Sequence, residues 1–137
     1  RQQELKSEVE IAIGIIESVN TEAKALGISR DVAQRRALEL LRPIRFFKNK
    51  SGYFMVHALE GKQARALLVP VKTDLEGQDV TDLRDSSEKL FVRDFMKAAR
   101  NGGGFVPYDF PKTPGGPPLP KLTYIGYFAP WNWEVGA

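Results

Sequence analysis

Aromatic residues, several of them with hydroxyl groups, are the residues of this sequence best placed to do chemistry. They recur in segments whose pattern predicts β-strands, and Arg65, Lys112 and Lys121 are interleaved with them. The aromatic residues in question are Tyr53, Phe105, Tyr108, Phe110, Tyr124, Tyr127, Phe128, Trp131 and Trp133. An apolar concavity excludes water, so a cation inside it pairs strongly with a carboxylate. The pattern fits either a pocket for a small anion or an ordinary sheet core whose cations reach solvent.

Residue types that carry covalent or metal chemistry are scarce. The 137 residues include no Cys and one His, which excludes a thiolate zinc site, a Cys nucleophile and a His pair for a metal. His57 lies on a predicted strand, where a histidine is typically a hydrogen-bonded core residue. An enzyme using Asp109 with His57 is the catalytic alternative. We therefore predict no catalytic residue, no metal and no cofactor.

Two local motifs suggest chemistry but have the wrong spacing or order. Gly102-Gly103-Gly104 follows a predicted helix and precedes a strand, whereas a phosphate-binding loop needs a strand before and a helix after it. The run predicts a helix end. The acidic residues between positions 74 and 85 do not have the ligand spacing of a calcium-binding loop, and they predict an acidic surface loop. These residues are Asp74, Glu76, Asp79, Asp82 and Asp85.

Basic residues are concentrated in one segment. The formal net charge is +3, but Arg30 to Lys50 holds seven basic residues against two acidic ones. Such a segment can bind phosphate backbones or lie near anionic lipid, although a solvated helix face is the simpler interpretation. We predict no nucleic-acid partner, and a nucleic-acid binder that uses this segment is kept as the alternative.

The elements that must position these residues begin with helices. Apolar residues recur at intervals of four and three from Leu5 to Leu26, which predicts one long helix over residues 1–27, ended by Gly27. This stripe fits a self-paired coiled coil and a helix lying along its own domain equally well. Ser29 caps a second helix, which Pro43 ends within the segment 28–50.

Strand and turn patterns follow from residue 51, and we expect one domain over residues 1–137. The segment 51–137 predicts a sheet interrupted by a short helix over 87–101, while the proline-rich 111–120 predicts a loop without regular structure. Short connections between neighbouring strands imply an antiparallel sheet, and hence an α+β fold. The predicted strands are 53–59, 64–69, 105–110, 122–128 and 131–135.

Several segments taken together resemble one known family. They are Gly52-Tyr53-Phe54-Met55-Val56, Leu75-Glu76-Gly77-Gln78-Asp79, Asp82-Leu83-Arg84-Asp85, Gly102 to Lys112, Pro120 to Tyr124, and Pro130-Trp131-Asn132-Trp133-Glu134-Val135-Gly136. Their order resembles the single Cache domain of type 2. The resemblance implies a long N-terminal helix on a PAS-like antiparallel sheet of about five strands with short helices.

The resemblance also implies a place in the cell and a partner. Such domains are periplasmic or extracytoplasmic sensors between two membrane helices, which this sequence does not include, and the chain reads as part of a longer protein. The resemblance favours a methyl-accepting chemotaxis receptor, with a histidine kinase or a cyclic-dinucleotide enzyme as the alternative. It further implies a small organic acid as ligand, of the acetate, propionate, pyruvate or lactate type, and a homodimer paired through the N-terminal helix.

The resemblance assigns ligand-binding positions residue by residue. It implies that Lys121 pairs with the carboxylate, helped by the hydroxyl of Tyr53 or Tyr124. Tyr108, Phe110 and Met55 would then wall the short alkyl end of the ligand. The full expected set is Tyr53, Met55, His57, Tyr108, Phe110, Lys121 and Tyr124.

This chain departs from the family pattern at two positions. Many members carry His-Pro after the first hairpin, whereas this chain has Val69-Pro70. The aromatic residue two positions after Tyr108 is often Trp, and here it is Phe110. Both changes alter the size and polarity of the expected pocket.

Overall fold

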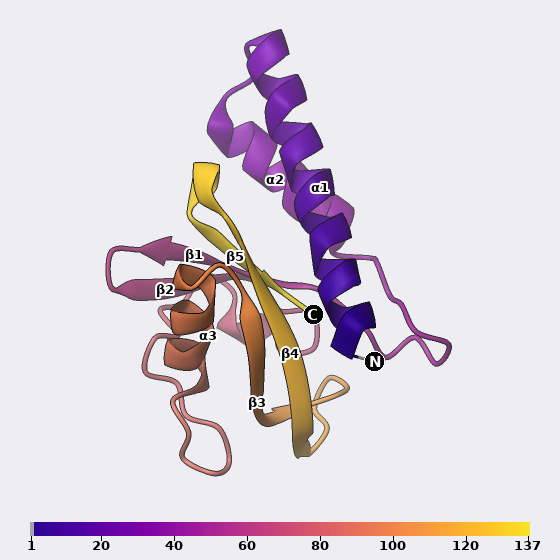
Figure 1. Ribbon diagram of the computed structural model, residues 1–137, viewed down its shortest axis with the longest axis vertical. Helices are drawn as coiled ribbons and strands as arrows, with labels where there is room; N and C mark the ends of the chain where they lie inside the picture. The colour runs from indigo at the N-terminus through magenta and orange to yellow at the C-terminus, as the bar shows by residue number, and fades with distance from the viewer. Residues whose placement is uncertain (1) are drawn as a thin grey trace.

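Three α-helices and a curled sheet make up the computed structural model, which describes residues 2–137 (Figure 1). The chain opens with α1 (Gln2–Leu26) and α2 (Arg30–Leu41), which pack against each other. No helix within the described residues is both long enough and apolar enough to cross a membrane.

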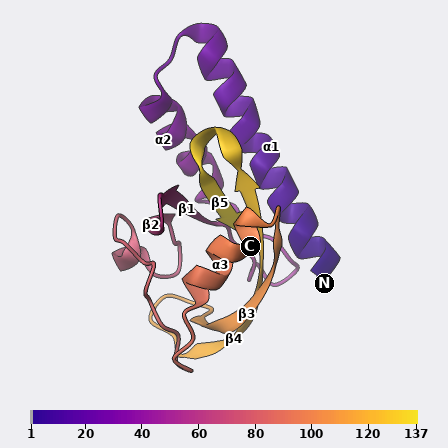
Figure 2. The ribbon, with the colours of Figure 1, turned by 60° about the vertical axis from the view of Figure 1, so that its left-hand side comes forward.

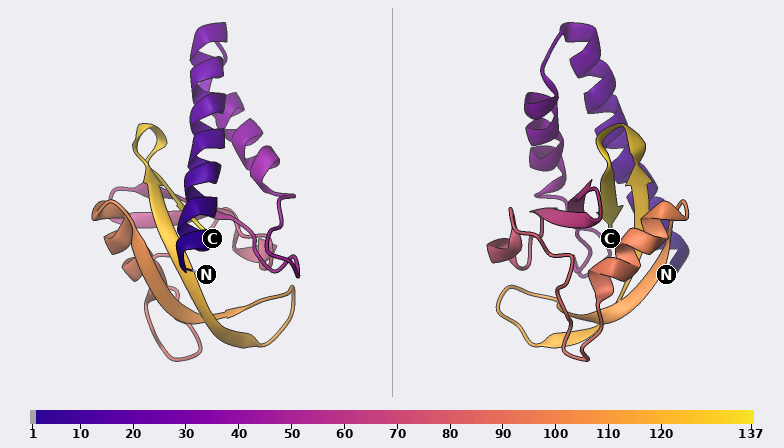
Figure 3. Two further views of the ribbon diagram at one scale, coloured as in Figure 1. Left: turned by 45° about the vertical axis from the view of Figure 1, so that its right-hand side comes forward. Right: turned by 90° about the vertical axis from the view of Figure 1, so that its left-hand side faces the viewer.

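Five strands form one antiparallel sheet in the order β2-β1-β5-β4-β3. The strands are β1 (Met55–Glu60), β2 (Gln63–Leu68), β3 (Gly104–Pro111), β4 (Pro118–Phe128) and β5 (Trp133–Gly136). The helix α3 (Phe91–Arg100) covers the face of the sheet opposite α1, as Figure 2 and both views of Figure 3 show. The α+β, PAS-like class expected from the sequence is confirmed.

The helix α1 lies along its own domain. Its stripe of Leu5, Val9, Ala12, Ile16 and Ala23 is buried against the sheet and α2. This burial decides between the two interpretations of the stripe, because the apolar residues that a coiled coil would use are already covered. Ser29 caps α2 as expected, since its Oγ accepts a hydrogen bond from the amide of Val32 at 3.3 Å.

The short helix begins later than the sequence predicts, at Phe91 instead of residue 87. Oδ1 of Asp85 accepts hydrogen bonds at 2.9 Å from the amides of Ser87 and Lys89, and Glu88 has a φ of 65°. These bonds fold residues 85–89 into a turn, because an Asp side chain offers nearby amides an alternative to a helix. The expected end is confirmed, since Gly102 and Gly103 have positive φ and the amide of Gly103 donates to the carbonyl of Ala98.

The prediction of a structureless loop over 111–120 was wrong. The strands β3 and β4 pair as far as Pro111 opposite Pro118, so only residues 112–117 connect them. Proline cannot donate to a sheet ladder and therefore sits at sheet edges. The strand β3 is an edge strand, and β4 meets β5 only from Ile125 onward, which leaves the beginning of β4 paired on one side.

Candidate functional site

A small chamber lies between the sheet and α3, and most of the expected site residues line it. On the α3 side of the sheet, β1 and the residues just before it contribute Tyr53, Met55 and His57. The strand β3 contributes Tyr108 and Phe110. We call this space, of about 20 Å³, the inner chamber. Its remaining walls are Val69, Leu75, Val80, Leu83, Phe91, Val92 and Phe95.

Aromatic rings give the inner chamber its shape. The rings of Phe91 and Tyr108 stack with centroids 4.8 Å apart and an interplanar angle of 7°. Phe95 meets Tyr108 edge-on at 5.0 Å, and Phe110 lies 6.0 Å from Phe91. Offset and edge-to-face contacts of this kind hold ring orientations firmly. The chamber is therefore built from rings on two elements, α3 and β3.

Lys121 stands at the border of the chamber. Its Nζ lies 3.9 Å from the centroid of the Tyr53 ring, in a cation–π contact. No carboxylate in residues 2–137 forms a salt bridge with it. Burial, together with the nearby charge of Lys112, lowers the pKa of Lys121 to about 7. An anion that enters beside this lysine therefore favours its charged form.

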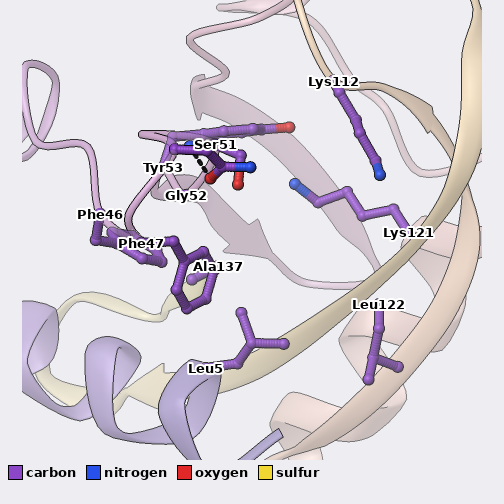
Figure 4. Close-up of a pocket in the computed structure, with 11 residues that line it drawn as sticks. Leu5, Phe46, Phe47, Ser51, Gly52, Tyr53, Lys112, Lys121, Leu122 and Ala137 are labelled. Carbon is purple, nitrogen blue, oxygen red and sulfur yellow. Dashed lines mark hydrogen bonds between the residues drawn. The ribbon is translucent and has the colours of Figure 1, made fainter. Parts of the chain in front are cut away.

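A larger outer cavity of about 270 Å³ adjoins this border. Tyr53 lines both spaces, and Lys121 extends toward its ring with Lys112 beside it (Figure 4). Leu5 at the beginning of α1 and Ala137 at the end of the chain also line the outer cavity. Lys121 therefore lines the same cavity as residues near both ends of the domain.

Tyr124 is the expected site residue that the structure does not bring to the group. It lies on the α1 side of β4, where its ring packs edge-on against Phe105 at 4.9 Å. Strand residues alternate between faces, so Lys121 and Tyr124, three apart, point to opposite sides. Of the two tyrosines expected beside Lys121, Tyr53 is the one that the structure places in contact with it.

Thr123 is a partner of the site residue candidate Tyr108 that the sequence reasoning missed. It is fully buried, and its Oγ1 lies 3.0 Å from the hydroxyl of Tyr108, so one donates to the other. Burial raises the pKa of the Tyr108 hydroxyl well above its usual range, and the same holds for Tyr53. Both phenols are therefore neutral hydrogen-bonding groups. The spacing of two residues from Lys121 was the signal in the sequence that could have found Thr123.

Glu134 is another partner that the sequence reasoning missed, because it forms a hydrogen bond with His57. Nδ1 of His57 lies 2.8 Å from Oε2 of Glu134, and the two residues face each other across β1 and β5. His57 is 5% exposed and Glu134 is completely buried. The expectation of a hydrogen-bonded core histidine is confirmed, although the same ring also lines the inner chamber. A lone acid between Trp133 and Val135 was the available signal.

Asp109 and His57, the pair of the catalytic alternative, have separate hydrogen-bond partners. Asp109 accepts hydrogen bonds from the hydroxyls of Ser86 and Ser87, at 2.9 and 2.7 Å, whereas His57 is engaged by Glu134. Asp109 and His57 therefore serve different local networks.

The acidic and basic segments have largely structural partners. Glu76 binds Arg42 through both carboxylate oxygens, and Asp82 pairs with Arg93. Arg45 donates to two backbone carbonyls of its own loop. Within residues 2–137 no cluster of three or more His, Cys, Asp or Glu side chains is arranged to hold a metal ion. The acidic residues of this surface loop thus stabilise turns and anchor α2.

The chain belongs to the family described as Single Cache domain 2, whose model matches residues 1–137. Among curated relatives, the methyl-accepting chemotaxis protein McpP of Pseudomonas putida is 29% identical over 130 residues, which are 94% of this chain and 23% of that protein. The sensor histidine kinase MctS of Rhizobium johnstonii is 23% identical over 136 residues, 99% of this chain and 28% of that protein. The chain thus spans about a quarter of the length of these relatives.

Solved structures agree with this assignment. A periplasmic sensor domain of a chemotaxis protein is 38% identical, with a TM-score of 0.89 over 99% of this chain and 92% of that one. A Cache chemosensory domain solved to explain carboxylic acid recognition is 27% identical, with a TM-score of 0.88 over 98% of this chain and 88% of that one. The extracytoplasmic location expected for the domain is confirmed by these relatives.

Proposed function

We propose that this chain is the ligand-binding sensor domain of a methyl-accepting chemotaxis receptor and that it binds a small organic acid at Lys121. The single observation that supports the proposal best is a partly buried lysine, without a carboxylate partner in the described chain, at the border of an aromatic chamber. A monocarboxylate supplies the missing charge, and the low local dielectric strengthens the pair.

The proposed ligand lies across the border between the two spaces. Its carboxylate accepts hydrogen bonds from Nζ of Lys121 and from the neutral hydroxyl of Tyr53. Its short carbon chain enters the inner chamber against Met55, Tyr108 and Phe110. Because the chamber measures only about 20 Å³, its walls must move outward to admit even a short chain. Binding is thereby coupled to a change of shape, as a sensor requires.

The two departures from the family pattern both fall on this chamber. Val69 and Phe110 line it directly. At position 69, valine has an apolar side chain where many members have an imidazole. At position 110, the phenylalanine ring is smaller than the tryptophan ring that is often found there. We therefore propose that the remaining polar groups of the chamber select the ligand, without a hydrogen bond from the side chain at position 69.

The sensor proposal includes no reaction. The acid is recognised and released unchanged, and its binding energy shifts the population between two states of the domain. The relative MctS, a sensor histidine kinase, supports the same sensing role joined to a different output as the second candidate.

A homodimer through α1 remains part of the proposal and would need the outer face of this helix. The inward stripe is covered by the domain, whereas Ile11 on the outer face is 57% exposed. A dimer contact built around Ile11 leaves the buried stripe undisturbed.

The proposed ligand class is tested by thermal unfolding with a panel of short organic acids. A ligand present at a hundred times its dissociation constant stabilises the folded state by about 2.7 kcal/mol. We expect at least one monocarboxylate with two to four carbon atoms to raise the melting temperature by several degrees. An amide of the same shape, such as propanamide for propanoate, is the control, and we expect no shift with it. A panel in which no acid raises the melting temperature contradicts the proposal.

A further inference from the structure

His57 and Glu134 form a buried polar pair to which the proposed acid site has so far given no role. His57 lies on β1 and Glu134 on β5, directly opposite each other in the sheet. The carboxylate of Glu134 is closed off from solvent, and its second oxygen, Oε1, has no hydrogen-bond partner among residues 2–137. The N–H of His57 is thus the side-chain donor on which this carboxylate depends.

This dependence fixes the orientation of the imidazole. Rotating the ring away would leave a fully buried carboxylate without the hydrogen bond at Oε2, which is strongly unfavourable. Phe95 also packs near the ring, with centroids 6.1 Å apart. With Nδ1 committed to Glu134, the ring atom left for other partners is Nε2.

We infer from the remaining possibilities that Nε2 of His57 faces the inner chamber. Nε2 forms no hydrogen bond within the described chain. A fully buried Nε2 would therefore be a second unpartnered buried atom, but within the described chain Glu134 Oε1 is the sole fully buried side-chain oxygen or nitrogen without a partner. Nε2 is therefore not fully enclosed, and the space that His57 borders is the inner chamber. Along β1, His57 follows Met55 on the same face, at the end of the chamber away from Tyr53 and Lys121.

We propose that His57, positioned by Glu134, selects ligands that carry a hydroxyl group at the end opposite their carboxylate. This inference rests on the proposed function, because it assumes a carboxylate held at Lys121. A methyl group placed against Nε2 removes the nitrogen from water without replacing its hydrogen bond, and that loss weakens binding. A hydroxyl group both donates and accepts, so it pairs with Nε2 whether or not that nitrogen carries a proton. A carbonyl only accepts, and it pairs only with a protonated Nε2.

Two acids of equal size measure this selection. Butanoate and 3-hydroxypropanoate have the same number of non-hydrogen atoms and differ by a terminal methyl against a terminal hydroxyl group. We expect calorimetric titration of the 137-residue chain to show 3-hydroxypropanoate binding about tenfold more tightly or better. Equal affinities, or a preference for butanoate, overturn this inference and leave the acid-binding proposal standing. Binding of neither acid, nor of any other in the panel, overturns both.

Variants of His57 and Glu134 distinguish a role in ligand selection from a purely structural role. His57→Phe alone would strand the buried Glu134, so we use the double variant His57→Phe/Glu134→Leu, which removes both polar partners together. We expect it to lose the preference while still binding butanoate. Glu134→Gln keeps an acceptor for Nδ1, and we expect it to keep the preference. A folded double variant that still prefers 3-hydroxypropanoate, or a Glu134→Gln variant that loses the preference, overturns the inference.

Discussion

At the scale of single residues, the site depends on a lysine whose surroundings weaken its charge. Burial and Lys112 lower the pKa of Lys121 to about 7, against 10.5 for an ordinary lysine. A bound carboxylate favours the charged form and raises this pKa again. Ligand binding therefore takes up a proton whenever the solution is more alkaline than pH 7.

The first prediction at this scale concerns pH. Above about pH 7 the free domain must protonate Lys121 before it pairs with an acid, so affinity falls by up to tenfold per pH unit. Calorimetry from pH 6 to 9, in two buffers with different ionisation enthalpies, measures both the decline and the proton uptake. Lys112→Met removes a repelling charge, and we expect its decline to begin at a higher pH. Affinity that is constant from pH 6 to 9 contradicts the account.

The unliganded chain should show the opposite dependence. Between pH 7 and about 10 an unfolded chain keeps Lys121 protonated while the folded chain does not. Because the unfolded state then binds more protons, this residue makes the folded state more stable as the pH rises through that range.

The individual residues also show what sequence reasoning can reach. Tyr53, Met55, His57, Tyr108 and Phe110 of the expected set line one chamber, and it was the resemblance to the family, carried by the order of its motifs, that drew these strands together. The partners that complete the site were not foreseen. Pairings such as His57 with Glu134 depend on which strands become neighbours, and they join residues 77 positions apart.

At the scale of elements, the close approach of α1 to β4 decides how the domain is built. Gly126 lies on β4 beneath α1, and a Cβ atom there would lie 2.8 Å from Cδ1 of Ile13 and 2.9 Å from Cγ1 of Val9. By contrast, Gly14 on α1 has open space around it. The helix can lie against the sheet because the strand carries no side chain at this point.

The prediction for this contact compares two identical substitutions. Gly126→Ala places a methyl group against the side chains of Val9 and Ile13, which must shift, and we expect the free energy of unfolding to fall by about 1–3 kcal/mol. Gly14→Ala improves helix propensity without a steric conflict, and we expect a gain of about 0.5–1 kcal/mol. Urea unfolding of the two variants measures both values. Equal effects of the two substitutions would show that the contact does not matter for stability.

Element boundaries show why the sequence predicted some features and not others. Periodicity located α1 and α2, because each buries an apolar stripe that repeats along the helix. The beginning of α3 depends on the side chain of Asp85, which also accepts from the amide of Asp109 at 3.0 Å. A bond to a distant strand leaves no periodic signal. The prolines of β4 were similarly misjudged, because edge positions are known only once the strand order is known.

At the scale of the whole molecule, the proposed ligand lies where the two ends of the domain meet. Leu5 near the beginning of α1 and Ala137 at the end of the chain border the same outer cavity as Lys121. A carboxylate that enters there contacts the sheet and lies beside both termini. We therefore propose that small movements around Lys121 reach both ends of the domain together, as the sensor role requires.

The most direct test of this account is calorimetric binding of the acid from the thermal panel to two lysine variants at pH 7. We expect Lys121→Met to weaken binding by at least about 30-fold, because the carboxylate loses the cation with which it pairs. Lys112→Met is the matched control, since this neighbouring lysine also lines the outer cavity, whereas Lys121 is the one that lies over the Tyr53 ring, and we expect equal or slightly tighter binding. Both variants must melt as cooperatively as the wild type. A Lys121→Met variant that binds the acid as tightly as the wild type would contradict the account.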